Sequence, residues 1–181
     1  MNRKFKSAKE SQVSITELML PSHSNFSGKI HGGYILNLMD QIAFACASKH
    51  SHSYCVTASV NKVDFLNPIE VGELVTLKAS INYTGRTSMV VGVRVESEHI
   101  TSGVKKHCNS SYFTMVAKDE AGNNKPVAGL LLENEQSIRR FTRSIERKNN
   151  ASDRENTFDS ANFKLEEHLT DLENQNAKVL L

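Results

Sequence analysis

The chain has 181 residues, a formal net charge of +2 and an apolar fraction of 39%, and its length predicts one domain with an extension. Its 22 basic and 20 acidic residues are nearly balanced, so charge does not favour a nucleic-acid partner. No apolar run approaches the roughly 18 residues of a membrane-spanning helix, and the basic N-terminus lacks the apolar segment of a secretory signal, so we expect no membrane insertion.

The N-terminal third of the chain predicts a strand, a loop and a helix, in that order. Residues 12–20 alternate loosely between polar and apolar and end at a proline, which suits a strand. A polar loop with three glycines follows. Residues 34–49 contain neither Gly nor Pro and are rich in Ala and Leu, which predicts a helix. The helix is apolar over most of its circumference, which is typical of a helix enclosed by other structure.

Four segments with a period of two follow the helix, over residues 54–65, 74–84, 87–99 and 106–118. In the second segment one face carries only apolar or aromatic residues: Val75, Leu77, Ala79, Ile81 and Tyr83. Together with the first strand, these segments predict an α+β domain in which a curved antiparallel sheet wraps around one long helix.

The chain changes character after the last of these strands. Residues 132–148 predict a basic surface helix, and the polar residues that follow predict a linker over 149–160 and a short amphipathic helix over 161–172. We therefore expect three parts: a domain over 1–128, a basic C-terminal helix over 129–148, and a polar tail over 149–181, partly disordered or weakly docked.

Three polar side chains interrupt the apolar helix. Asn37, Asp40 and Gln41 lie at positions i, i+3 and i+4, so they share one face. A carboxylate on such a helix is costly to bury unless it is paired or faces a cavity, as a catalytic base does. The residues leave equally open that Asp40 faces solvent at a sheet edge or caps a neighbouring loop.

His31, Gly32 and Gly33 come directly before the helix. A helix N-terminus presents unpaired N–H groups, and glycines let a ligand oxygen approach, so this segment could act as an oxyanion hole. The glycines could equally serve only to turn the loop into the helix. Asn25, in the same loop, could orient a water or a carbonyl, although loop asparagines more often stabilise turns.

The remaining candidates for chemistry are weaker. His31 could be a general base, but no Ser or Cys stands near it in an elbow motif. Cys46, Cys55 and Cys108 lack metal-binding spacing, so we expect reduced thiols, no bound metal and a cytoplasmic protein. Cys46 lies deep in the apolar helix and is expected to pack as a small hydrophobic residue.

Several separated motifs resemble the HotDog-fold acyl-CoA thioesterases, and among them the cytosolic acyl-CoA hydrolase branch. They are NFSGKIHGGYILNLMD over 25–40, VTASV over 56–60, DFLNPI over 64–69, Gly72, and GRTSM over 85–89. The resemblance extends over about residues 12–148. It implies a HotDog fold, a dimer that often assembles further into a hexamer, and hydrolysis of acyl-CoA to a free fatty acid and coenzyme A without another cofactor.

The resemblance also implies roles for individual residues. Asn25 and Asp40 would be catalytic and would face each other across the dimer interface. Asp40 would activate water. The backbone of His31, Gly32 and Gly33 would hold the thioester oxygen.

Coenzyme A would contact the start of a strand, at Gly85, Arg86, Thr87 and Ser88.

Two features depart from the family: residues 149–181 have no counterpart, and His23 stands where relatives commonly have an acidic residue. Other readings are a non-catalytic acyl-CoA-binding module, a HotDog dehydratase that recruits His31, and a purely structural domain.

Overall fold

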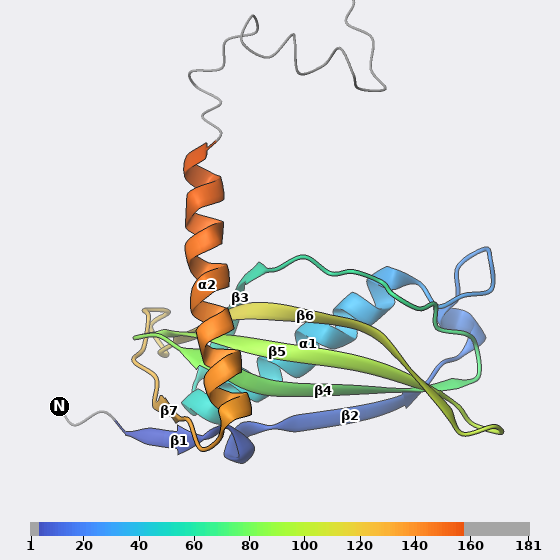
Figure 1. Ribbon diagram of the computed structural model, residues 1–181, viewed down its shortest axis with the longest axis horizontal. Helices are drawn as coiled ribbons and strands as arrows, with labels where there is room; N and C mark the ends of the chain where they lie inside the picture. Colours follow the sequence, from blue (N-terminus) through green and yellow to red (C-terminus); the bar gives the residue numbers. More distant parts are fainter. Residues whose placement is uncertain (1–3, 158–181) are drawn as a thin grey trace, which may run out of the picture. The chain divides into compact units, whose positions relative to one another are not determined.

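The computed structural model describes residues 4–157 of the chain. The chain divides into two compact units, Met1–Ser144 and Ile145–Leu181. Helix α2 (Glu135–Thr157) extends through this boundary, and every other helix and strand of the described residues lies in the first unit (Figure 1).

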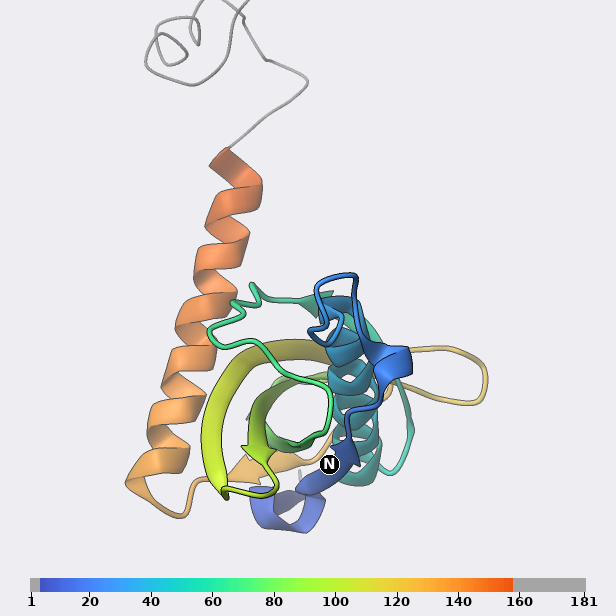
Figure 2. The same ribbon diagram turned by 90° about the vertical axis from the view of Figure 1, so that its right-hand side faces the viewer.

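A five-stranded antiparallel sheet curls around helix α1 (Gly32–Ser51), as Figure 2 shows. The strand order is β2-β4-β5-β6-β3, so β3 is an edge strand that pairs only with β6 among the described residues. The strands are β2 (Val13–Leu18), β3 (Tyr54–Val60), β4 (Glu73–Thr84), β5 (Ser88–His99) and β6 (Val104–Lys118). This confirms the predicted α+β HotDog fold.

The core lies between α1 and the concave face of the sheet. Buried apolar residues of α1 recur at helical spacing, and Val75, Leu77, Ala79 and Ile81 of β4 are also buried. A bulge between Ile81 and Tyr83 then reverses which side chains face inward. Tyr83 therefore does not share the inner face, as its alternation predicted, and instead lies beside Phe141 of α2, with ring centroids 4.9 Å apart.

Helix α1 is less enclosed than its composition suggests. Its side toward the sheet is buried, but Asn37, Gln41 and Phe44 are exposed along the other side. All three cysteines are free and buried, and burial raises the pKa of Cys46 to about 12. Cys46 therefore packs as the small hydrophobic residue that the sequence predicts.

Several element ends differ from the predictions for local reasons. Strand β3 stops at Val60 instead of residue 65, because the following segment meets β6 through single main-chain bonds at Asn61 and Leu66. Helix α2 continues to Thr157, past residue 148, since neither Gly nor Pro interrupts it. The short helix expected over 161–172 lies outside the described residues.

A small parallel sheet of β1 (Phe5–Ser7) and β7 (Gly129–Leu131), which the sequence pattern does not predict, joins the two ends of the domain. Strands of three residues are too short to show alternation. Between β1 and β2 lies the short helix η1 (Ala8–Ser11).

His50, at the end of α1, forms hydrogen bonds with residues near both of these terminal strands. Its ring is fully buried, with Nδ1 3.2 Å from the Ser11 hydroxyl and Nε2 3.3 Å from the Ala128 carbonyl oxygen. Burial lowers the pKa of His50 in the folded state. The unfolded chain, with an ordinary pKa near 6.5, therefore takes up a proton first as the pH falls.

We expect this difference to make the free energy of unfolding pH-dependent. The contribution of His50 is present above about pH 6.5 and is lost as the pH falls below that value. Urea denaturation at about pH 7 and pH 5 should show a smaller loss of stability in His50→Gln than in the wild type. An identical loss in both proteins would contradict this role.

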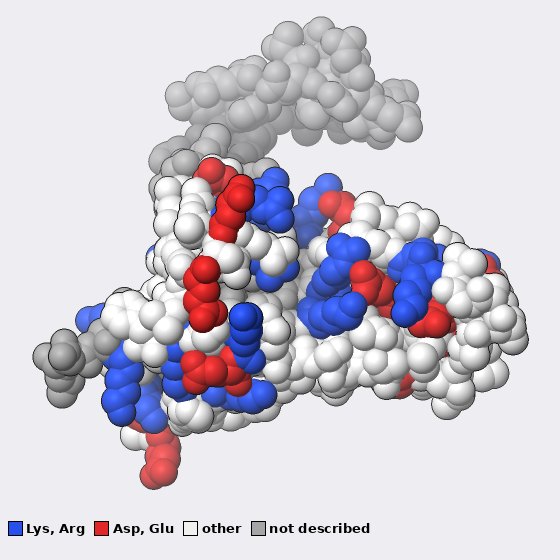
Figure 3. All heavy atoms as spheres, turned by 60° about the horizontal axis from the view of Figure 1, so that its bottom comes forward, with Lys and Arg blue, Asp and Glu red and all other residues white. Residues whose placement is uncertain are grey.

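Charges of both signs are interspersed on the surface (Figure 3). On β4 and β5, Lys78 and Arg94 both pair with Glu96 and lower its pKa to about 2. Lys105 of β6 forms an ion pair with Glu98 at 3.2 Å. No helix among the described residues is long and apolar enough to cross a membrane.

Candidate active site

Asn25 begins the loop that leads into α1 and uses its side-chain oxygen to hold that loop. Oδ1 accepts hydrogen bonds from the Ser27 amide (3.0 Å), the Ser27 hydroxyl (2.7 Å) and the Lys29 amide (3.2 Å). Asn25 thus stabilises a turn. The residue is exposed, and its Nδ2 group has no partner within residues 4–157, so it remains able to donate to a ligand.

His31 caps the N-terminus of α1. Its Nδ1 atom accepts from the Gly33 amide at 3.3 Å, and its carbonyl accepts from the Tyr34 amide at 3.0 Å. The helix consequently begins at Gly32, two residues earlier than predicted. Of the two glycine N–H groups, only that of Gly32 has no hydrogen-bond partner in the described part of the chain.

The start of α1 is held in place by its neighbours. The Tyr34 ring stacks on His23 with centroids 4.0 Å apart, and the Tyr34 hydroxyl donates to Glu17 on β2. This hydrogen bond raises the pKa of Tyr34 to about 12. The His31 amide donates to the His23 carbonyl at 2.9 Å. These contacts fix the direction in which the Gly32 N–H points.

Asp40 lies two turns further along α1, on its partly exposed side. The Thr57 hydroxyl on β3 donates to Asp40 Oδ1 at 2.6 Å, and it also lies 3.5 Å from the Met115 sulfur. The second carboxylate oxygen has no partner among residues 4–157. Asp40 therefore lies beside the edge strand β3, with one oxygen hydrogen-bonded to Thr57 and the other without a partner among the described residues.

Thr57 is a site residue that the sequence pattern does not single out. It stands in the VTASV motif, but nothing in a single sequence shows that this strand returns beside the helix with Thr57 opposite Asp40. A hydroxyl facing a helical carboxylate becomes visible only when the pairing of β3 with β6 places it there.

The predicted coenzyme A segment forms the tight turn between β4 and β5. The Gly85 amide donates to the Ser88 carbonyl at 2.8 Å. Ser88 pairs with Val116 of β6, and Val116 pairs with Val56 of β3. At about 4.8 Å per strand, the turn lies about 10 Å from the strand that carries the Asp40 partner.

The site residues consequently form two groups within one chain. The loop group contains Asn25 and the Gly32 N–H, and the sheet group contains Asp40, Thr57 and the turn 85–88. Asp40 follows Gly32 by eight residues, or about 12 Å along the helix axis at 1.5 Å per residue. The two groups therefore lie well apart along the helix of one chain.

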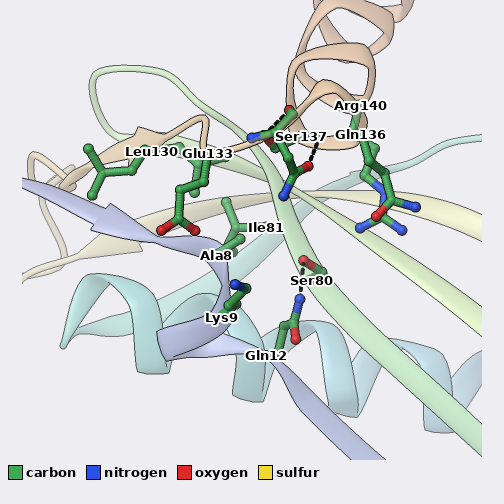
Figure 4. Close-up of a pocket in the computed structure, with 12 residues that line it drawn as sticks. Ala8, Lys9, Gln12, Ser80, Ile81, Leu130, Glu133, Gln136, Ser137 and Arg140 are labelled. Atoms are coloured by element: carbon green, nitrogen blue, oxygen red, sulfur yellow. Dashed lines mark hydrogen bonds between the residues drawn. The ribbon is translucent and has the colours of Figure 1, made fainter.

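A separate hollow of about 100 Å³ lies between η1, β4, β7 and the first turns of α2 (Figure 4). Lys9, Glu133 and Arg140 contribute charges of both signs to its lining. None of the predicted site residues lines it.

Within residues 4–157 no group of three or more His, Cys, Asp or Glu side chains could hold a metal ion.

The sequence is similar to named proteins over most of its length. The profile of the Thioesterase superfamily matches residues 27–104. Protein VdlD of Helicobacter pylori is 41% identical over 141 residues, which cover 78% of this chain and 80% of that protein. The uncharacterized acyl-CoA thioester hydrolase YkhA of Bacillus subtilis is 34% identical over 146 residues, which cover 81% and 85%.

Solved structures share the same fold. An apo-hexameric acyl-CoA thioesterase superposes with a TM-score of 0.83 and 37% identity, over 86% of this chain and 99% of that one. An acyl-CoA hydrolase from Staphylococcus aureus, in complex with butyryl coenzyme A, coenzyme A and coenzyme A disulfide, has a TM-score of 0.78 and 30% identity, over 83% and 92%.

Alanine variants of the Staphylococcus aureus hydrolase have also been solved, at an asparagine, an aspartate and a threonine. These three positions are 15 and 17 residues apart in that protein. Asn25, Asp40 and Thr57 have the same spacing in this chain.

Proposed function

The chain belongs to the thioesterase superfamily, and from this premise we propose that it hydrolyses acyl-CoA to the free carboxylic acid and coenzyme A, with Asp40 as the general base. Its relatives and structural neighbours include acyl-CoA thioester hydrolases. The hydrogen bond between Thr57 and Asp40 is the observation that carries the mechanism, because it leaves one oriented, open carboxylate oxygen on a partly exposed helix face.

In this mechanism Asp40 removes a proton from a water molecule as the water oxygen bonds to the thioester carbon. The carbonyl oxygen becomes an oxyanion, which the Gly32 N–H stabilises by donation at the positive end of α1. The carbon–sulfur bond then breaks, coenzyme A leaves as a thiolate, and the proton returns to it. A thiolate is a good leaving group, so no strong general acid is required.

Thr57 orients the base. Its hydroxyl donates to Oδ1, which leaves the second oxygen available to accept the proton of a water molecule. Asn25 contributes its free Nδ2 group, which can donate to the water or to the thioester oxygen. The reaction requires no cofactor, because coenzyme A is part of the substrate.

We propose that two chains share each active site. The separation of roughly 12 Å between Gly32 and Asp40 along the helix axis disfavours a site within one chain, whereas a two-fold dimer would bring the loop group of one chain to the sheet group of its partner. The edge of β3, which has no partner strand among residues 4–157, and the exposed residues Asn37 and Phe44 of α1 provide a surface for such pairing. Hexameric neighbours support further assembly of such dimers into a trimer of dimers.

The turn 85–88 would contact the nucleotide portion of coenzyme A. Arg86 is exposed at the tip of this turn, where its guanidinium can pair with a phosphate. We expect Arg86→Ala to raise KM for acyl-CoA several-fold and to change kcat less, because a phosphate contact stabilises substrate and transition state alike. Steady-state kinetics would check this, with Arg94→Ala on the same strand pair as a control. An unchanged KM would indicate that residues 85–88 only form the turn between β4 and β5 and do not bind coenzyme A.

Hydrolysis of an acyl-CoA series from acetyl to palmitoyl, with detection of the released thiol, tests the proposed function. We expect turnover of at least one member of the series. Binding of coenzyme A esters without release of thiol would instead indicate a non-catalytic acyl-CoA-binding module.

A further inference from the structure

Phe65 stands against the glycine that supplies the open N–H group. The ring carbon Cζ lies 3.2 Å from the position that a Cβ atom on Gly32 would occupy, and two further ring carbons lie at 3.5 and 3.7 Å. The side chain is nevertheless 53% exposed. An aromatic ring at this place therefore presents a large apolar surface right beside the predicted oxyanion donor.

The backbone that carries Phe65 is fixed on the side that leads into β4. The Leu66 amide donates to the Cys108 carbonyl at 2.9 Å, and the Asn67 side chain donates to the His107 carbonyl at 2.8 Å. Pro68 follows and restricts the chain further. The ring position is thus set by anchors on β6, and only its side-chain rotations remain free.

We propose that the Phe65 ring is a steric filter that selects acyl groups without a branch at the carbon next to the thioester carbonyl. The proposal rests on the proposed role of Gly32. An oxygen that accepts from the Gly32 N–H at about 2.9 Å brings the carbonyl carbon and its two substituents close to the ring. Every acyl-CoA carries the same sulfur substituent, so the ring can distinguish substrates only through the acyl carbon.

Two isomeric substrates test this inference. Butyryl-CoA and 2-methylpropanoyl-CoA contain the same atoms and differ only in branching at that carbon. In Phe65→Ala we expect the ratio of kcat/KM for the branched over the linear substrate to rise about 10-fold or more, because one methyl group in a close-fitting site changes specificity by about 10–200-fold. Phe65→Leu should give a smaller rise in the same direction.

Leu66→Ala is the matched control, because Leu66 is the next residue and is 59% exposed. Its ratio should equal that of the wild type. If Phe65→Ala does not fold, Phe65→Leu alone carries the test, with thermal melting as the check of folding.

The outcomes separate this inference from the proposed function. If the wild type hydrolyses butyryl-CoA and the ratio is unchanged in both Phe65 variants, the filter is overturned and the thioesterase remains. An equal change in kcat/KM for both substrates also overturns the filter, because it places the ring on the coenzyme A side. If the wild type hydrolyses neither substrate nor any other acyl-CoA, the proposed function fails, and the filter with it.

Discussion

Asp40→Asn is expected to lower kcat for acyl-CoA hydrolysis by about 10²–10⁴-fold, which is the usual contribution of a positioned general base. The amide keeps the size of the carboxylate and can still accept a hydrogen bond from Thr57, so the fold should be unaffected. It cannot take up the proton of the attacking water. Coenzyme A binding, measured by calorimetry, should stay within a few-fold of the wild type.

Lys49→Ala serves as the control for this substitution. Lys49 is exposed, lies nine residues after Asp40 on the same helix, and has no proposed role. Its kcat should match that of the wild type. Near-normal turnover in Asp40→Asn would reject Asp40 as the base and would favour the reading in which its carboxylate only joins α1 to β3.

Mixed dimers of two inactive variants should recover activity if two chains share each site. Asn25→Ala and Asp40→Asn homodimers lack one component in both sites, so each should be nearly inactive. In a mixed dimer, one site collects both substitutions. The other combines wild-type Asn25 from the Asp40→Asn chain with wild-type Asp40 from the Asn25→Ala chain.

Random pairing of equal amounts of the two variants makes half of the dimers mixed, each with one intact site of two. About a quarter of the wild-type activity should therefore return after the two proteins are refolded together. Differently tagged chains and two-step purification would verify the mixed dimer. Verified mixed dimers that stay as inactive as their parents would refute the shared site and would leave the hydrolase assignment in place.

The helix and strands of the sheet could be predicted from the sequence because their burial follows a simple period. Residues on one side of α1 and alternate residues of β4 pack into the same core and must be apolar. Their spacing therefore shows in the sequence as a period of apolar residues. The prediction was wrong where a bulge reversed the alternation of side chains or where a strand was very short. The bulge before Tyr83 moved that ring to the outer face, and the three-residue strands β1 and β7 were too short to show any period.

For the candidate site, the sequence by itself determined which residues could take part. Asn25, the glycines before the helix and Asp40 were recognisable because rare polar residues and paired glycines interrupt an otherwise regular pattern, and because their motifs resemble a known family. Only the tertiary structure decided how these groups are used. In the folded chain, Thr57 donates a hydrogen bond to Asp40, and His31 accepts one from the Gly33 N–H. The Phe65 ring lies against Gly32. Two of these contacts connect residues 17 or more positions apart, and their geometry depends on how the sheet curls around α1, which no local pattern encodes.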